Sequence, residues 1–450
     1  MVLKVDQLLK LDVASIRDGM ERGSLTATQL AEAYLEQIAK CEKDVQAFSW
    51  HDAEHVRAQA GELDRYRSLG LPIGPLHGVP VAVKDIIDTS DIPTENGCSA
   101  DAGRVPTKDA YVIERLRAAG AVMIGKTVTA ELAFMHPGKT RNPHNLSHTP
   151  GGSSQGSAAA IAAAMAPLAI GTQTGGSIIR PASFCGVTGF KPTFGRIPRR
   201  GVLSQSPSLD TVGVFARTPL DAAALADALF GADTQDDATQ FLPAARLFET
   251  AAQASPLPPV FALVRPPGWE QASEEVHEAF AELADALGEQ VFEVDLPSLF
   301  NEAEEVRKRI NYAEMARCFY SYWRKSAGAL SGELLAAIEE GNQILARDYI
   351  AALDVPKVLS AALEEIFSRC DAIICPAALG PAPEGLDTTG NPLFNGLWTL
   401  TGHPAVTLPL LHSGNDLPMG VQLVGERGND ARLLRTANWL AYWSATDQDG

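Results

Sequence analysis

A short turn after an apolar run places a hydroxyl beside two glycines. The run LAIGTQT leads into Thr174, Gly175, Gly176 and Ser177. Glycines let the chain turn tightly and let a substrate approach the backbone N–H groups. These four residues could therefore supply the oxyanion hole that acyl transfer requires. The alternative is an ordinary turn between a strand and a helix.

A lysine stands where an apolar strand is expected to end. Lys84 follows VPVAV (79–83) and precedes Asp85. Burial disfavours the charged form of an amine, and a neutral lysine can act as general base in serine-lysine hydrolases. A pKa lowered by roughly three units from about 10.4 corresponds to about 4 kcal/mol of differential solvation. The alternative is an ion pair with Asp85 or another carboxylate.

A stretch rich in glycine and serine precedes an alanine-rich segment. Residues 151–157 read GGSSQGS, without the Lys and Ser/Thr that a phosphate-binding loop needs after its last glycine. A flexible linker is disfavoured because apolar sequence resumes at once. GSSQG does match the nucleophile elbow G-x-S-x-G, with Ser154 at its centre, but the preceding HNLSHTP is no core strand. An esterase of that type would also need a later Asp and a later His such as His403.

The elements that must position these residues alternate between strand and helix. Strands are expected at 79–83, 121–125 and over LAIGTQT, with helices at 109–120, after the glycine- and serine-rich stretch, and from Pro181. The later strands are VFALV, VFEVDLP, DAIICPA, PAVTLPL and MGVQLVGE. Helices are expected at 272–287, 299–324, 331–351, 357–369 and over the closing DARLLRTANWLAYW. The pattern predicts an α/β fold with a large mixed, mainly parallel sheet covered by helices on both faces.

The chain is expected to form one domain over 1–450. Residues 1–60 read as a helical outer layer, beginning one helix with the capping box Thr26 and Gln29. The catalytic core is expected at 78–215 and a variable, substrate-shaping region at 230–360. Residues 234–258 lack firm periodicity and are the best candidate for a surface excursion.

Composition excludes several classes of function. A net charge of −18 argues against a nucleic-acid partner, which clustered Lys and Arg would hold. No segment indicates a membrane partner, and the first residues, MVLKVDQLLKLDVASIRDG, resemble neither a secretory signal nor a transit peptide, so a cytoplasmic location is expected. The six cysteines lack the spacing of a disulfide framework or zinc site. None of the nine histidines has metal-ligand spacing on a common helix, and we expect no metal or cofactor.

Together these segments resemble the amidase signature family. The family's hallmark is a Gly-Gly-Ser-Ser stretch, a helix, a Gly-Thr-x-Thr-Gly-Gly-Ser turn and Pro-Ala-x-x-Cys-Gly, which here extends from Pro150 to Thr193. HGVPVAVKDIID resembles the segment that carries the family's lysine, and CPAALGPAP and GVQLVG resemble its C-terminal strands. The resemblance covers nearly the whole chain and is weakest between about 230 and 360.

The resemblance implies a mechanism and the roles of individual residues. Ser177 is the nucleophile, Ser153 relays its proton and neutral Lys84 is the base. A cis peptide bond is implied before Ser153, and Thr172 matches a position whose hydroxyl supports the relay serine. Many relatives are homodimers, so a homodimer is a further possibility.

The position of one arginine suggests a substrate. Arg180 follows the nucleophile by three residues in Ser177-Ile178-Ile179-Arg180, which is similar to malonamidase-type members. In those members the matching arginine helps to hold a substrate carboxylate, a task that suits guanidinium geometry. The substrate would then be a small monoamide such as malonamate. Alternatively, Arg180 pairs with an internal acid and braces the turn.

Other functions remain open from the sequence. A broad aliphatic or aryl amidase is plausible because nothing in the sequence sizes the acyl pocket. A glutamine amidotransferase A subunit belongs to the same family and would need partner subunits and tRNA. A silent small-molecule-binding scaffold is the alternative outside enzymes, and intact Lys84, Ser153 and Ser177 argue against it.

Overall fold

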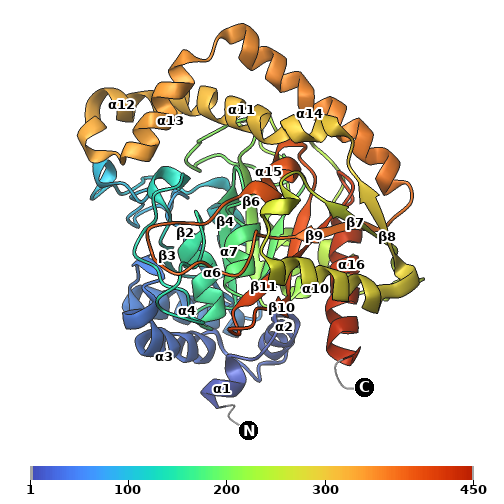
Figure 1. The fold of residues 1–450 in the computed structure, drawn as a ribbon. Helices are drawn as coiled ribbons and strands as arrows, with labels where there is room; N and C mark the ends of the chain where they lie inside the picture. Colours follow the sequence, from blue (N-terminus) through green and yellow to red (C-terminus); the bar gives the residue numbers. More distant parts are fainter. Residues whose placement is uncertain (1–3, 448–450) are drawn as a thin grey trace.

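The computed structural model describes residues 4–447, and in this part of the chain eleven strands form one sheet (Figure 1). Their order is β1-β3-β2-β4-β6-β5-β10-β11-β9-β7-β8. The strands are β1 Phe48–Trp50, β2 Pro80–Lys84, β3 Val122–Thr127, β4 Leu168–Gln173, β5 Thr188–Lys191, β6 Thr211–Ala216, β7 Phe261–Arg265, β8 Val291–Asp295, β9 Ala372–Pro376, β10 Ala405–His412 and β11 Pro418–Val424.

The sheet is mixed, as predicted, but the prediction that it is mainly parallel is wrong. Within residues 4–447, six of its ten neighbouring strand pairs are antiparallel and four are parallel. The alternating segment from Gly78 onward does give parallel pairs, because β2 pairs with both β3 and β4. In contrast, β6 lies antiparallel beside β4, and a short connection joins β10 to β11, as only an antiparallel pair allows.

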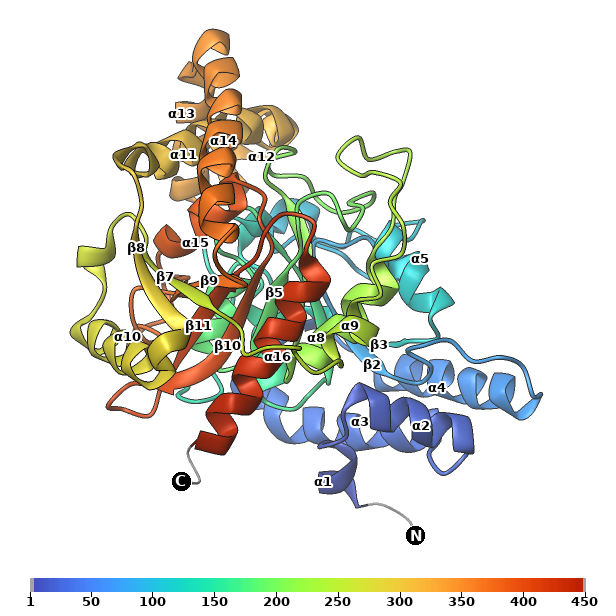
Figure 2. The same ribbon diagram turned by 90° about the vertical axis from the view of Figure 1, so that its right-hand side faces the viewer.

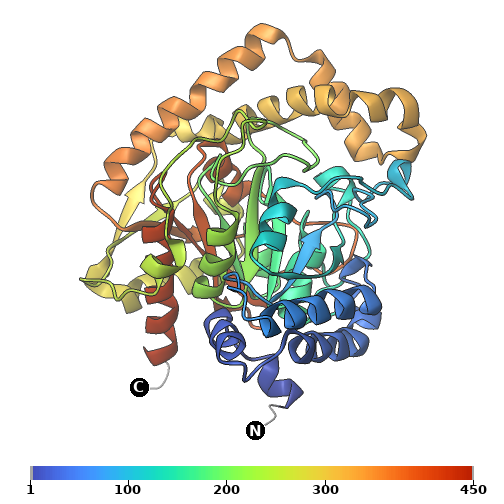
Figure 3. The same ribbon diagram turned by 180° about the vertical axis from the view of Figure 1, so that it is seen from behind.

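Helices cover both faces of the sheet, as predicted (Figures 1 and 3). On one face lie α6 Gln155–Ala162, α7 Ile179–Phe184 and α10 Glu274–Leu287. On the other lie α5 Tyr111–Ala118, α8 Pro219–Leu229, α9 Leu247–Ala251 and α16 Asp430–Asp447. The helix expected to start at Pro181 begins at Ile179 instead, so the proline is its third residue.

The N-terminal segment forms a layer of helices outside the sheet. It contains α1 Val5–Leu8, α2 Val13–Arg22, α3 Ala27–Val45 and α4 Ala53–Ser68. The capping box is present, since Gln29 N–H donates to the Thr26 hydroxyl and Thr26 N–H donates to the Gln29 side chain. The short edge strand β1, which pairs antiparallel with β3, was not predicted, and neither were the central strands β5 and β6.

Four helices arch beyond one end of the sheet (Figures 1 and 2). They are α11 Ala303–Cys318, α12 Tyr320–Ser326, α13 Gly332–Gln343 and α14 Ala346–Phe367. The predicted break between 351 and 357 is wrong, because α14 continues through Pro356. Ala352 and Leu359 are buried on either side of the proline, and this packing offsets the hydrogen bond that a proline removes. Beneath the arch, α15 Leu393–Leu400 packs against α11.

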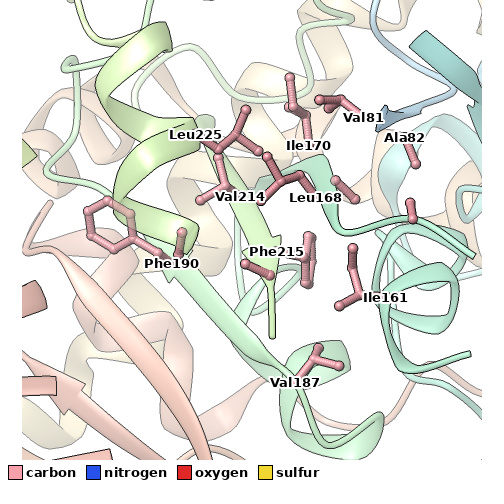
Figure 4. Packing of buried hydrophobic residues seen from close by; sticks show 14 of the residues in the cluster. Val81, Ala82, Ile161, Leu168, Ile170, Val187, Phe190, Val214, Phe215 and Leu225 are labelled. Carbon is pink, nitrogen blue, oxygen red and sulfur yellow. The ribbon is translucent and has the colours of Figure 1, made fainter. Parts of the chain in front are cut away.

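The apolar core binds the sheet to its helices. Figure 4 shows β4 side chains Leu168 and Ile170 beside Val214 and Phe215 of β6, with Ile161 of α6 close by. Such packing fixes the ends of β2 and β4, which carry the candidate site residues. No helix in the described part of the chain combines the length and apolar character that a membrane span requires.

Candidate active site

Lys84 ends β2 and is fully buried. Its Nζ donates hydrogen bonds of 2.8 Å to the hydroxyl of Ser153 and 2.8 Å to the hydroxyl of Thr172. The alternative ion pair with Asp85 is wrong, because that carboxylate lies 3.3 Å from Lys126 Nζ. No ion pair among the described residues includes Lys84.

Burial sets the protonation of Lys84. Desolvation lowers the pKa of this lysine well below its usual 10.5, while the charge of Asp210 acts in the opposite direction. The amine is therefore easily held neutral, and a neutral amine can accept a proton from a hydroxyl.

Ser153 lies just before α6 and is buried. The Gly152–Ser153 peptide bond is cis, as the resemblance implied. Its hydroxyl accepts the hydrogen bond from Lys84. Thr172 contacts Lys84 rather than the hydroxyl of Ser153, so its support for the serine passes through the lysine.

The turn that follows β4 presents Ser177 to a cavity. Among residues 4–447, the hydroxyl of Ser177 has no hydrogen-bond partner, and the N–H groups of Gly175, Gly176 and Ser177 donate to no acceptor. All three residues line the cavity. Free amides beside a free hydroxyl suit an oxyanion hole. A direct hydrogen bond between Ser177 and Ser153 is not formed.

Gln173 holds this turn from inside. Its side-chain oxygen accepts from the N–H groups of Ile178 at 2.8 Å and Ile179 at 3.0 Å. Its amide nitrogen donates to the hydroxyl of Thr399 on α15. The glutamine thus fixes both the start of α7 and the path of the turn.

Position 176 requires glycine because the side chains of Asn395 and Arg180 lie close to its backbone. An ideal Cβ on this residue would lie 2.3 Å from Asn395 Oδ1 and 2.9 Å from Arg180 Nη1. Any side chain would therefore displace α15 or Arg180 from the turn.

Asp210 supports the other end of the turn. It accepts from the hydroxyl of Thr174 at 2.6 Å and from the N–H groups of Gln205 and Ser206 at 2.9 Å each. Burial raises the pKa of Asp210 to about 6, against these hydrogen bonds and the nearby Arg199. It therefore carries a negative charge near neutral pH.

The cavity beside Ser177 measures about 180 Å³. Besides the turn itself, its wall includes Arg180, Glu304, Arg307, Asn311 and Tyr312. Arg307 lies on α11 and pairs with Glu304 three residues earlier, at 2.6 Å. A second cavity of about 170 Å³ adjoins Thr172, Thr174 and Asp210.

Arg180 is buried and bonds to carbonyl groups. Its Nε donates to Thr389 O at 2.6 Å, and its Nη2 donates to Gly152 O at 2.8 Å. No carboxylate among the described residues pairs with it, so the alternative of an internal acid is wrong. Burial and the charge of Arg307 lower the pKa of Arg180 to about 9.

The Ser154 hydroxyl has a structural role. It is fully buried and exchanges hydrogen bonds of 3.2 Å with the backbone N–H and C=O of Thr172. His403 is also buried, with its ring stacked on Phe367 and bonded to Thr401. Neither residue lines the cavity beside Ser177.

The sequence did not single out Gln173, Asp210, Asn395 or Arg307. Asp210 and Arg307 are ordinary polar residues of a loop and an amphipathic helix, and only tertiary structure brings them to the turn. The described residues contain no cluster of three or more histidine, cysteine or carboxylate side chains that could hold a metal.

The chain is similar to proteins of one known family over nearly its whole length. A family model described as Amidase matches residues 29–434. The A subunit of a glutamyl-tRNA(Gln) amidotransferase from Streptomyces coelicolor is 33% identical over 474 residues, covering 96% of this chain and 95% of the relative.

Two solved structures have the same fold. One belongs to a vestigial protein complex that bears on the evolutionary origins of an s-triazine catabolic enzyme; its TM-score is 0.89 at 27% identity, covering 97% of this chain and 98% of that one. The other is native peptide amidase from Stenotrophomonas maltophilia, with a TM-score of 0.82 at 30% identity and 97% coverage of both chains.

Proposed function

The chain belongs to the amidase family and hydrolyses amide C–N bonds, and from this premise we propose that it releases ammonia from a small carboxamide through an acyl-enzyme. The observation that carries the mechanism is the buried Lys84 Nζ, 2.8 Å from the Ser153 hydroxyl and without a carboxylate partner among the described residues. Ser177 is the nucleophile, Ser153 the proton relay and Lys84 the base.

In the first half of the reaction, Ser177 Oγ bonds to the amide carbon. Its proton passes to Ser153, whose own proton passes to Lys84 Nζ. The free N–H groups of the turn stabilise the resulting oxyanion. When the C–N bond breaks, the same relay returns a proton to the departing nitrogen, which leaves as ammonia.

In the second half, water hydrolyses the acyl-enzyme. Lys84 is neutral again and takes a proton from water through Ser153. The new oxygen bonds to the acyl carbon, the bond to Ser177 breaks, and Ser177 recovers its proton. The products are a carboxylic acid and ammonia, and no cofactor is consumed.

The substrate is a small monoamide that carries a carboxylate, such as malonamate. Two arginines and one glutamate face a cavity of about 180 Å³, which suits a short anionic molecule. The malonamidase-type resemblance rests on the residues around Arg180, since the relative named above belongs to an amidotransferase.

A second candidate is an amidotransferase A subunit. The Streptomyces coelicolor relative supports it, with similarity over 96% of this chain. In that case the chain would use glutamine as ammonia donor and act with further subunits. A broad aliphatic or aryl amidase is the third candidate.

Ammonia release by the purified chain tests these candidates. The substrates are malonamate, a neutral aliphatic amide, an aryl amide and glutamine, each with the wild type and with Ser177→Ala. We expect malonamate to be preferred and its turnover to fall about a thousandfold or more in the variant, because the nucleophile is lost. Turnover of neutral amides alone would contradict the anionic substrate, and turnover of glutamine alone would favour the amidotransferase.

A further inference from the structure

The cavity beside Ser177 is positive inside an acidic protein. Its wall contains the guanidinium groups of Arg180 and Arg307 and the carboxylate of Glu304, whereas the whole chain has a net charge of −18. One positive charge is therefore in excess at the site. The two arginines differ in how they meet the cavity.

Arg180 offers no accessible nitrogen to a ligand. Its Nε and Nη2 donate to the carbonyl groups of Thr389 and Gly152. Its Nη1 has no partner among the described residues and is sealed from solvent beneath the turn. An ideal Cβ on Gly176 would lie only 2.9 Å from that Nη1. The guanidinium group thus supports the turn from behind.

Arg307 does have a free nitrogen at the cavity. Its Nε and Nη2 donate to the two oxygens of Glu304 at 2.9 Å and 2.6 Å. Its Nη1 has no partner among the described residues and, unlike Arg180 Nη1, is not fully buried. An ideal Cβ on Gly175 would lie 3.4 Å from this Nη1, so the free nitrogen faces the turn that carries Ser177.

The neighbours of Arg307 hold it in this position. Glu304 accepts hydrogen bonds from one side of the guanidinium group. The backbone of α15 packs closely against it, since an ideal Cβ on Gly396 would lie 2.8 Å from Arg307 Nε. Burial opposes the charge, but pairing with Glu304 keeps the pKa of Arg307 above its usual value. A fixed, charged and unpaired donor is suited to bind an anion.

We infer that Arg307 is the specificity-determining residue that binds the carboxylate of the substrate through Nη1, and that Arg180 is a positioning residue behind the turn. This inference rests on the proposed function. It also limits the substrate, because one cavity of about 180 Å³ contains both Ser177 and Arg307. The carboxylate and the scissile amide must therefore be close together, as in a monoamide of a short dicarboxylic acid.

Malonamate and malonamide are the matched probes, because they differ in charge but hardly in size. In Arg307→Met we expect KM for malonamate to rise about tenfold or more, while kcat/KM for malonamide falls by a much smaller factor. In Arg307→Lys, KM for malonamate should lie between the values of the wild type and of Arg307→Met. Lysine keeps the positive charge but cannot bind both oxygens of Glu304 as the guanidinium group does. In Arg180→Met both substrates should lose kcat, because the turn loses its support.

Lys308→Met is the control on the same helix. Lys308 pairs with Glu340 at 3.0 Å and does not line the cavity, so both substrates should behave as with the wild type. Equal losses on malonamate and malonamide in Arg307→Met would assign Arg307 a structural role and overturn the inference. An unchanged KM for malonamate would overturn it too.

Binding of malonate separates this inference from the proposed reaction. Calorimetry with the Ser177→Ala protein requires no turnover. Malonate should bind, and binding should weaken about tenfold or more in the double variant with Arg307→Met but not in that with Lys308→Met. If malonate binds in this way but no amide is hydrolysed, the anion site at Arg307 is supported and the proposed hydrolytic function is rejected. If malonate does not bind, the inference fails.

Discussion

Asp210 connects the proposed oxyanion turn electrostatically to Lys84, the proposed base. Its carboxylate holds Thr174 and raises the pKa of Lys84, against the larger effect of burial. Because the pKa of Asp210 is itself raised to about 6, the carboxylate is charged above that pH. The acid limb of the activity profile therefore reports on both residues.

Asp210→Asn should move this acid limb to lower pH. Lys84 must be neutral to accept a proton, so kcat/KM falls as pH falls through the lowered pKa of Lys84. Removal of the Asp210 charge lowers that pKa further. The measurement is kcat/KM for the best amide as a function of pH. The control is Asp354→Asn, whose exposed carboxylate pairs with Lys357 and should leave the limb in place. If the acid limb of the Asp210→Asn profile stays in place or moves to higher pH, Asp210 does not raise the pKa of Lys84.

Local sequence was sufficient to predict some site residues but not others. Lys84 is unusual after an apolar strand and Ser177 follows two glycines, so residue type and neighbours pointed to these two. Only the family resemblance selected Ser153 over its neighbour Ser154. Arg307 looks like any arginine on an amphipathic helix, and its free Nη1 results from Glu304 and α15 together. Such a property depends on tertiary contacts that one segment does not encode.

The helix α6 is tightly docked where it follows Ser153. Gly156 N–H donates to Val128 O, and an ideal Cβ on Gly156 would lie 2.1 Å from Ala47 O and 2.5 Å from Val128 N. These are backbone atoms of the outer layer and of the segment after β3, which cannot rotate away. Close docking of α6 therefore fixes the position of Ser153.

Gly156→Ala should displace α6 and lower both stability and activity. We expect the free energy of unfolding to fall by about 2–3 kcal/mol, as for overpacked cores, and kcat to fall with it. Urea unfolding and ammonia release measure the two effects.

Gly61→Ala is the matched control for this substitution. Gly61 lies within α4, and an ideal Cβ there meets no atom within 4 Å. Alanine should raise the free energy of unfolding by about 0.5–1 kcal/mol, because it is the better helix former, and leave kcat unchanged. Similar stability losses in both variants would refute the role of close packing at Gly156.

Among the elements, long periodic segments could be predicted and short or interrupted ones could not. The strand β1 has only three residues and depends on β3 for its hydrogen bonds, so its sequence is too short to show the alternation that predicts a strand. A helix boundary was expected between 351 and 357, yet α14 continues through Pro356. Antiparallel pairing of β4 with β6 depends on the path of the chain, which strand and helix alternation does not specify.

At the scale of the whole molecule, the sheet consists of two halves. Strands β1 to β6 come from one part of the chain and β7 to β11 from the other, and β5 and β10 form the pair that joins them. The excursion at 234–258 lies between α8 and β7, contains α9 and links the halves along the chain. Lys84, Ser153 and Ser177 belong to the first half, and Arg307 belongs to the second.

Chymotrypsin should cut this link first. Phe241 is 80% exposed in an irregular stretch, whereas the exposed Tyr320 and Tyr442 lie within helices. The two fragments should elute together in size exclusion and retain ammonia release, since β5 pairs with β10 and α9 packs on α16. A first cut elsewhere, or separation of the fragments, would show that the halves are not held as described. The predicted homodimer can be examined on the same column.

The pairing of β5 with β10 joins the half of the molecule that carries the proposed proton relay to the half that carries Arg307, the proposed carboxylate-binding residue. Catalysis and substrate choice can therefore be altered separately by evolution and by protein engineering. Substitutions in α11 can change the choice of amide while Lys84, Ser153 and Ser177 stay as they are, whereas α15 also holds the turn of Ser177 through Thr399. A library for new substrates is therefore best confined to α11, and chimeras between relatives are best recombined within residues 234–258.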